Sequence, residues 1–408
     1  MQLSIKIIPM ESSSMNANAP ILPPETVVEA AELVARARAL VPTLRERSQH
    51  CEQLRHIPRE TFDDFRESGL LRIAQPRQFQ GWGHGIDTIA EVGMEIGRGC
   101  GSSAWMAGQW PGHQFMVGYF SQEAQQEYWA DDPDTMSSTA SAVARLNIEP
   151  ERGGFRVRDS QMRFSSGCDY AQWIFFTTHH GMGLIPRSEF EVLDDWHVAG
   201  LRGTGSKSVV VKDAWIPPHR FVSMDDLRTG STPGASIYSD NPYYQVPFNL
   251  VVNQLLLAAT IGMSRGILEL FEERVTKRMD LHTFKPACEG AGTQLRFAES
   301  SAEVDAAVMF IRNNCSTLAG WGRVGHVPDS AERARMRRDV AYATRLSLQA
   351  SNRLINSGDA SAMFDSQQLG RLGRDITMAG LQANLTWDEP AQTFSRARWG
   401  LNPLSNLT

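Results

Sequence analysis

The sequence predicts an α+β protein, mostly α-helical, in which a central β domain separates two helical regions. Helical periodicity runs to about residue 130, short β-branched and aromatic runs fill residues 131–230, and long helical segments return from about residue 240. Strands and helices do not alternate along the chain, which argues against a parallel dinucleotide-binding sheet. The 408 residues leave room for two or three domains.

The first helical domain is expected over residues 25–130, after a flexible N-terminal extension at residues 1–24. The extension lacks the apolar core and the small-residue cleavage site of a signal peptide. Thr26 and Glu29 have the spacing of a capping box at the start of a helix. The glycine-rich stretch at 97–103 lacks the preceding strand and the lysine of a phosphate loop, so it predicts a helix break or a tight helix contact.

The central β domain is expected over residues 131–230. Its short runs "GGFRVR", "QWIFFTT", "GMGLIP" and "SVVVKDAWIP" are rich in β-branched and aromatic residues, and glycine, proline and aspartate separate them. This spacing is typical of a small antiparallel barrel or sandwich.

The C-terminal helical bundle is expected over residues 240–408, where it also forms the predicted oligomer interface. The segment "FNLVVNQLLLAATIG" is apolar on nearly all sides, as in a helix buried within a bundle or between subunits. A second capping box, Asp329 with Glu332, opens a helix that is expected to end near Gly358.

Composition narrows the possible partners and location. The net charge of -6 offers no basic excess for binding nucleic acid or an anionic membrane. No apolar run approaches the roughly 18 residues of a membrane span, so none is predicted. Five scattered cysteines without paired spacing favour a reducing cytoplasm, no disulfide framework and no metal site.

A glycine-rich turn in "DDWHVAGLRGTGSKSVVV" is a candidate binding site at the start of a strand. Its glycines allow positive φ and close approach of a ligand to the backbone. Arg202, Thr204 and Ser206 could hold a phosphate or the edge of a flavin. The alternative is an ordinary glycine-rich β-turn.

Two further candidates precede or flank apolar segments. Ser165, Ser166 and Gly167 stand just ahead of a buried strand, where hydroxyls could bond a planar heterocycle or only cap a turn. His113 lies among aromatic and apolar residues, as either a core histidine or a catalytic base.

Taken together, the segments "FSSGCDYAQW", "DDWHVAGLRGTGSKSVVVKDAWIPPHR", "NPYYQVPF" and "GRLGRDITMAGLQANLTWD" resemble those of a known family. This family comprises the two-component, group D flavin-dependent monooxygenases built on the acyl-CoA dehydrogenase fold. The chain is similar to the oxygenase components that hydroxylate phenols such as p-hydroxyphenylacetate or a secosteroid phenol. The resemblance runs from about residue 25 to the C-terminus and implies an acyl-CoA dehydrogenase-like fold.

The resemblance also implies an enzyme and its reaction. A separate NAD(P)H:flavin reductase would supply reduced flavin, FMN or FAD. With O2 it would form a C4a-hydroperoxyflavin that oxygenates a small aromatic or heteroaromatic substrate. The family is usually a homotetramer in which a neighbouring subunit helps to hold the flavin, and no metal takes part.

By the same resemblance, site residues can be carried over to this chain. Ser166 would face flavin N5 as a catalytic group, and His113 would act as a catalytic base or orienting group at the substrate. The other cofactor-binding residues would be Gly167, Trp196, Arg202, Thr204, Gly205 and Ser206. The substrate pocket would be lined by His113, Ser138 or Ser141, Tyr170 and Gln382.

Two positions depart from the family pattern and keep alternatives open. Tyr170 and Gln382 stand where the family usually has histidine, and glutamine cannot act as a general acid. An N- or S-oxygenase of natural-product biosynthesis is therefore one alternative. An acyl-CoA dehydrogenase is a second, although "MSSTASAV" replaces the loop typical of those enzymes, and a non-enzymatic flavin-binding protein is a third.

Overall fold

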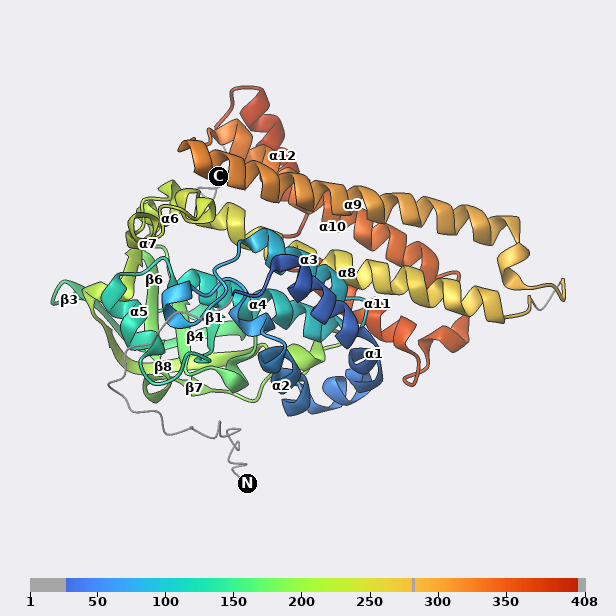
Figure 1. Cartoon of the computed structure of the whole chain (residues 1–408), viewed down its shortest axis with the longest axis horizontal. Coiled ribbons are helices and arrows are strands. Elements are labelled where there is room, and N and C mark those ends of the chain that lie inside the picture. The colour runs from blue at the N-terminus through green and yellow to red at the C-terminus, as the bar shows by residue number, and fades with distance from the viewer. Residues whose placement is uncertain (1–26, 281–282, 403–408) are drawn as a thin grey trace.

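The computed structural model describes residues 27–280 and 283–402. The predicted extension at 1–24 and Thr26 of the first predicted capping box lie outside the described residues. Within the described part, the chain forms a helical region, a β region and a second helical region, in that order (Figure 1).

The N-terminal helical region packs around one long buried helix, α4. Its helices are α1 (Ala30–Leu54), α2 (Arg59–Glu67), α3 (Ile86–Ile96), α4 (Gly101–Val117) and α5 (Gln122–Trp129). The side chain of Ser121 caps α5 by accepting from the amide of Ala124. Nearly every residue of α4 is buried, so this helix can present side chains only to the protein interior.

The glycine-rich stretch at 97–103 is a helix break and a tight helix contact, as predicted. It joins the end of α3 to the start of α4. A Cβ atom on Gly97 would lie 2.5 Å from the backbone of Gly262 on α8 (Phe248–Lys277). Only glycine permits this approach of the two backbones.

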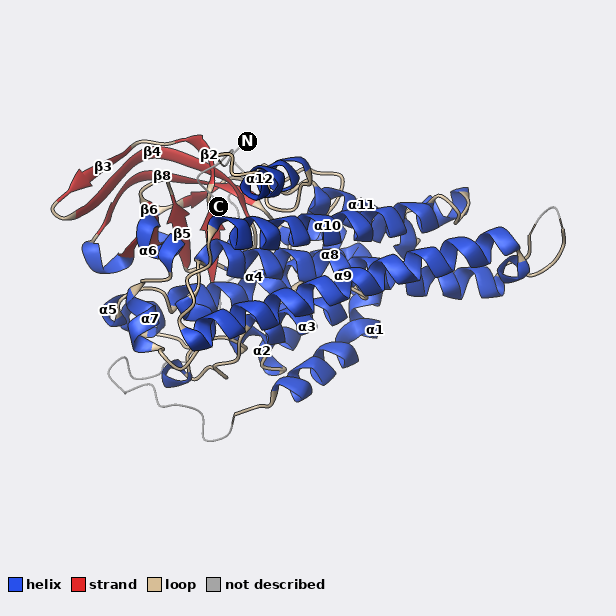
Figure 2. Ribbon diagram, turned by 90° about the horizontal axis from the view of Figure 1, so that it is seen from above, coloured by secondary structure: helices blue, strands red, loops and turns tan. Residues whose placement is uncertain are grey.

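The β region is a sandwich of two sheets (Figure 2). One sheet has the order β1-β5-β6-β9 and the other β2-β4-β8-β7, with β3 paired to β4. The strands are β1 (Ser137–Ala140), β2 (Ala142–Arg145), β3 (Ile148–Glu151), β4 (Gly154–Ser165), β5 (Trp173–Thr177), β6 (Gly181–Pro186), β7 (Glu191–Val192), β8 (Lys207–Ile216) and β9 (Phe221–Ser223).

The prediction of an antiparallel sandwich holds for most strand pairs but not for all. β1 and β5 pair in parallel, because the chain leaves β1 for the other sheet, runs through β2, β3 and β4 there, and only then returns. A separate apolar core lies in this region, with Val157, Ile174, Phe176, Val211 and Ile216 almost fully buried.

The C-terminal region is an elongated helical bundle that extends away from the sandwich (Figure 1). It contains α8, α9 (Ala291–Val324), α10 (Ser330–Ile355), α11 (Gln368–Gly380) and α12 (Asp388–Arg398), preceded by the short helices α6 (Met224–Thr229) and α7 (Pro233–Ile237). The predicted capping box at Asp329 and Glu332 is confirmed, with both reciprocal hydrogen bonds present.

α8 corrects the prediction that no segment is apolar and long enough to span a membrane. By length and hydropathy this helix meets that test, with a mean hydropathy of 1.4 over an 18-residue window. However, 89% of that window is buried inside the protein, against other helices of the fold. The burial identifies α8 as the core helix of the bundle, which the apolar periodicity had indicated.

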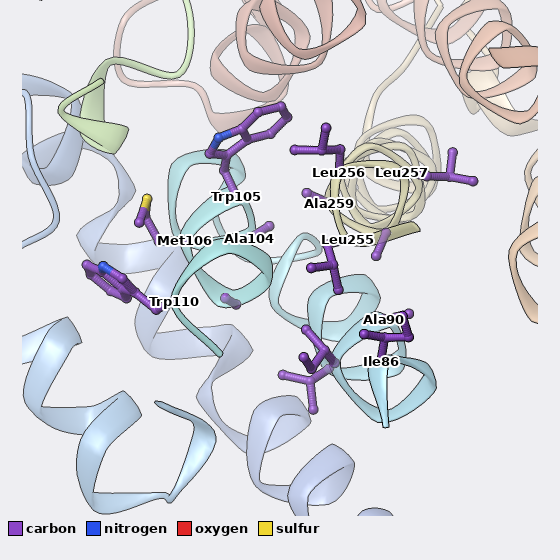
Figure 3. Packing of buried hydrophobic residues seen from close by; sticks show 14 of the residues in the cluster. Ile86, Ala90, Ala104, Trp105, Met106, Trp110, Leu255, Leu256, Leu257 and Ala259 are labelled. Carbon is purple, nitrogen blue, oxygen red and sulfur yellow. The ribbon is translucent and has the colours of Figure 1, made fainter. Parts of the chain in front are cut away.

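α4 and α8 lie next to each other in the main core (Figure 3). Trp105 on α4 and Leu256 on α8 point toward the same region between the two helices. Met106 and Trp110 leave α4 on the side away from α8. α4 therefore has one face toward the bundle and another toward the residues that follow β4.

Candidate active site

The serine-glycine corner after β4 lies against the glycine-rich turn before β8. The amide of Gly167 donates to the carbonyl of Thr204 at 2.9 Å. The hydroxyls of Ser166 and Ser206 are 2.7 Å apart, and those of Ser206 and Thr204 are 2.6 Å apart. These contacts bring together the two segments that the sequence placed at one site.

Trp105 extends this chain of hydroxyls toward α4. Its indole N–H donates to Ser166 Oγ at 3.2 Å. A donated hydrogen bond from Trp105 leaves the hydroxyl hydrogen of Ser166 free to point elsewhere. Trp105 was not singled out from the sequence, because an indole on a buried helix has no signature of its own.

Glycine is required at both segments by backbone conformation and by space. Gly167 and Gly205 have φ values of 72° and 55°, in the left-handed region. A Cβ atom on Gly167 would lie 2.5 Å from the Met106 side chain, and one on Gly205 would lie 2.7 Å from Asp169. Asp169 in turn pairs with the buried Lys207 at 2.6 Å, which anchors the turn to the corner.

Arg202 contributes an unsatisfied hydrogen-bond donor to the turn. Its Nε is buried and has no hydrogen-bond partner among the described residues. A buried donor without a partner costs roughly 1–3 kcal/mol, so the group calls for an explanation. An electronegative atom of a flavin would satisfy it. The orphaned donor, the hydroxyl chain and the glycine backbones together fit a flavin.

Trp196 lies at the edge of the same turn. Its indole N–H donates to the carbonyl of Leu201 at 3.2 Å, and its ring meets Phe164 edge-on with centroids 6.1 Å apart. Phe164 is 56% exposed and has a φ of 63°, which is strained for a residue other than glycine. An exposed aromatic ring thus stands beside the serine-glycine corner.

His113 is a buried histidine with both ring nitrogens engaged. Nδ1 is 2.7 Å from the carbonyl of Ser137, so it must carry the proton. Nε2 is 2.7 Å from Thr139 Oγ1 and accepts from that hydroxyl. Burial lowers the pKa of His113 to about 4, so the ring is neutral at physiological pH.

Thr139, rather than Ser138 or Ser141, presents its hydroxyl to His113. Side chains alternate along β1, so Ser138 faces the other way and bonds Ser165 at 2.9 Å. Ser141 follows β1 and is exposed. Because side chains alternate along a strand, the sequence places Thr139 on the same face as Ser137. It does not show which face of β1 packs against α4.

The structure places Tyr170 and Gln382 apart from this hydroxyl network. The hydroxyl of Tyr170 donates to the carbonyl of Ile57 at 2.9 Å, and its ring stacks on Phe62. Gln382 follows α11, and its side-chain oxygen accepts from the amide of Asn384 at 2.6 Å. Both side chains have partners within their own surroundings, so their substrate-binding roles stay predictions.

The low pKa of His113 predicts a pH-dependent stability. An unfolded histidine takes up a proton near pH 6.5, but folded His113 does so only near pH 4. The stabilisation is therefore complete above about pH 6.5 and is lost as the pH falls toward 4, by about 3 kcal/mol in total. Urea unfolding at pH 7.5 and 5.0 measures the loss.

His113→Gln is expected to reduce the difference in unfolding free energy between these two pH values. The matched control is His50→Gln, since His50 is exposed on α1. If His113→Gln and His50→Gln show the same pH dependence as the unaltered protein, His113 does not carry the effect.

Within residues 27–280 and 283–402, no group of three or more histidine, cysteine, aspartate or glutamate side chains is arranged to hold a metal ion. The polar groups of the site are hydroxyls, indole N–H groups and one guanidinium, which are suited to a polar organic ligand.

Family models match both helical regions. Residues 28–132 match the acyl-CoA dehydrogenase N-terminal domain, and residues 255–386 match its C-terminal domain. The crystal structure of the HsaA monooxygenase from Mycobacterium tuberculosis has a TM-score of 0.86 to this chain at 29% identity, covering 93% of this chain and 100% of that one. The fold prediction is thereby confirmed.

Curated relatives match nearly the whole chain. The oxygenase subunit HsaA of a flavin-dependent monooxygenase from Mycobacterium tuberculosis is 30% identical over 92% of this chain and 97% of its own. The oxygenase component of an FADH2-dependent resorcinol hydroxylase from a Rhizobium species is 28% identical over 91% and 95%. These relatives support oxygenation rather than acyl-CoA dehydrogenation. The chain belongs to the oxygenase components of the two-component flavin-dependent monooxygenases that share the acyl-CoA dehydrogenase fold.

Proposed function

We propose that this oxygenase hydroxylates a small phenol-like aromatic substrate that lies between Ser166 and Thr139. The observation that carries the proposal is the pair of hydroxyl arrays at the two ends of one face of α4. Trp105 bonds Ser166 near one end, and His113 bonds Thr139 near the other. Eight residues separate Trp105 from His113, which is roughly 12 Å along the helix.

A hydrogen bond within the β region also connects the Ser166 end of the site to the Thr139 end. Ser138 and Ser165 bond each other across β1 and β4, and each precedes one of the two site residues, Thr139 and Ser166. On α8, the apolar side chain of Leu256 points toward Trp105 (Figure 3). Apolar surroundings of this kind would exclude water and favour an aromatic ring.

Bound reduced flavin supplies the electrons that activate dioxygen. Arg202, Thr204 and Ser206 bind and orient the flavin at the turn. Ser166 holds a hydrogen bond at flavin N5, as in the family pattern, and the indole of Trp105 fixes the position of that hydroxyl. A proton held at N5 by Ser166 slows wasteful release of hydrogen peroxide.

The His113–Thr139 pair orients and polarises the substrate hydroxyl. The Thr139 hydroxyl donates to His113, so its oxygen is available to accept from the substrate. Full transfer of a phenol proton, with a pKa near 10, to a ring with a pKa near 4 would cost roughly 8 kcal/mol. This cost favours a polarising hydrogen bond over complete deprotonation.

The reduced flavin is delivered by a separate NAD(P)H-dependent reductase, in keeping with the names "oxygenase subunit" and "oxygenase component" of the relatives. FAD is the preferred form, as in the resorcinol hydroxylase. We also propose a cytoplasmic homotetramer. Support comes from exposed apolar side chains along α9, where Leu295, Met309 and Val324 are each more than 70% exposed.

The function is tested by supplying a flavin reductase, NADH and FAD under 18O2, with a panel of phenols, indoles and thioethers. Incorporation of one 18O atom into a phenol, detected by mass spectrometry, is the expected result. Labelling of only the nitrogen or sulfur compounds would instead establish the N- or S-oxygenase. Consumption of O2 without any labelled product would refute oxygenation of this substrate panel.

Ser166→Ala is expected to increase the fraction of electrons recovered as hydrogen peroxide, because the proton at N5 loses its partner. The peroxide yield per NADH is measured with a peroxidase assay. Ser395→Ala on α12, where the hydroxyl bonds only its own helix, serves as the control. An unchanged yield in Ser166→Ala would contradict the N5 assignment.

A further inference from the structure

The flavin-binding turn is held through the backbone of one residue, Leu201. Its amide donates to Asp375 Oδ1 at 2.6 Å. Its carbonyl accepts from the Thr204 hydroxyl at 2.8 Å and from the Trp196 indole at 3.2 Å. Leu201 thus holds the Thr204 hydroxyl directly, and through it the hydroxyls of Ser206 and Ser166.

Leu201 needs this support because its conformation is unfavourable. Its φ is 52°, in the left-handed region, which costs a residue with a Cβ atom roughly 1 kcal/mol or more. A strained residue stays in place only when its surroundings hold it there. The shortest hydrogen bond of Leu201 is the one that its amide donates to Asp375, on a helix of a different region.

Asp375 reaches the turn through space that two glycines leave open. A Cβ atom on Gly101, at the start of α4, would lie 2.6 Å from Asp375 Oδ2. One on Gly200 would lie 2.1 Å from the carbonyl of Arg374, next to Asp375 on α11. Three segments far apart in sequence thus meet at this carboxyl group, which is 5% exposed.

Burying the carboxyl group of Asp375 at this position costs free energy. Burial, together with nearby Cys100 and Glu52, raises the pKa of Asp375 to about 7, while the hydrogen bond from the Leu201 amide and the charge of Arg374 oppose the rise. An apolar residue would avoid that cost. The retained carboxyl group is explained if its oxygen is needed as the acceptor for the Leu201 amide.

We propose that Asp375 is a positioning residue for flavin binding: its hydrogen bond to Leu201 fixes the turn, and with it Thr204, Ser206 and Ser166, before the flavin arrives. The proposal rests on the proposed flavin site. In this proposal, a residue of α11 orders the turn that precedes β8. Asp375 itself acts through Leu201 and is not a catalytic residue.

The test compares Asp375→Asn with Asp375→Leu. Asparagine keeps an oxygen acceptor for Leu201, so the dissociation constant for FAD, from the quenching of flavin fluorescence, is expected to stay within about threefold. Leucine removes the acceptor, and the dissociation constant is expected to rise by about 10-fold or more. The KM for reduced flavin is expected to rise with it, while kcat at saturating flavin changes little.

Asp339→Leu controls for general destabilisation. Asp339 is also a buried carboxylate, but on α10, where it pairs with Arg335 at 3.2 Å and with Arg338. If Asp375→Leu weakens FAD binding no more than Asp339→Leu does, the role of Asp375 is only structural and the proposal is overturned. Where Asp375→Leu does not fold, Asp375→Ala takes its place, with the same expected loss of affinity.

Failure of this proposal can be told from failure of the flavin site. If Arg202→Leu weakens FAD binding but neither Asp375→Leu nor Asp375→Ala does, only the role of Asp375 is overturned. If Arg202→Leu leaves FAD binding intact as well, the flavin binds elsewhere and both assignments fail.

Discussion

Replacing Thr139 by valine is expected to lower kcat/KM for a phenol by about 10- to 100-fold, with the dissociation constant for FAD within about twofold of the original. Valine has nearly the shape of threonine but lacks the hydroxyl between His113 Nε2 and the substrate. The substrate hydroxyl then lacks its acceptor in the complex, which costs about 1.5–3 kcal/mol. Initial rates of hydroxylated product under saturating reduced flavin measure the effect.

Thr139→Ser separates the effect of losing the hydroxyl from the effect of losing the methyl group, because serine lacks only the methyl group. Serine retains the oxygen, so most of the activity is expected to return. Ser141→Ala is the matched control, because Ser141 lies just beyond β1 and is exposed. Equal activity of the valine and serine variants would show that the Thr139 hydroxyl does not contact the substrate.

The order of helical, β and helical regions was predictable because each region has its own hydrophobic period. α8 is apolar on nearly all sides, and α10 begins with a capping box, so local sequence defines both. The parallel pairing of β1 with β5 was not predictable, because pairing partners are set by how the chain passes between the two sheets. Periodicity reveals a strand but not its neighbour.

The flavin-binding segments were recognisable because their chemistry is concentrated in short strings. Ser166, Gly167, Thr204 and Ser206 lie within two such strings, and the structure joins them by hydrogen bonds. Their contact with a flavin remains a prediction. Their assignment came from the resemblance of these strings to a known family, since the glycines and hydroxyls alone left an ordinary turn open.

Residues that act across regions were missed for a common reason. Trp105, Thr139 and Asp375 each reach the site from a different element, and the sequence does not show that these elements meet. His113 was found, but its state was not, because whether it is satisfied depends on the register of β1 against α4. Such information exists only in the packed structure.

Replacing Arg202 by leucine is expected to raise the dissociation constant for FAD by about 100-fold and to leave the free protein as stable as before or more so. The Nε of Arg202 is buried without a partner, so its removal ends a desolvation cost in the free protein. In the complex, the same change removes a charge-assisted hydrogen bond to the flavin, roughly 1.5–3 kcal/mol. Fluorescence titration and thermal unfolding measure the two quantities.

A loss of affinity for FAD without a loss of stability in the free protein distinguishes a binding group from a structural one. At a flavin concentration 100 times the original dissociation constant, FAD stabilises the unaltered protein by about 2.7 kcal/mol and the variant by only about 0.4 kcal/mol. Arg202→Lys keeps the charge but not the planar fork, so it is expected to restore only part of the affinity. Arg296→Leu, on the exposed face of α9, is the control.

Comparison of FAD, FMN and riboflavin then locates the atom that Arg202 binds. If Arg202 contacts the isoalloxazine ring, the leucine variant loses the same factor in affinity for all three ligands. If it contacts a phosphate, riboflavin binding is unaffected, because riboflavin lacks that group. A leucine variant that loses stability but keeps its affinity for all three would mean that Arg202 supports the turn and does not bind the flavin.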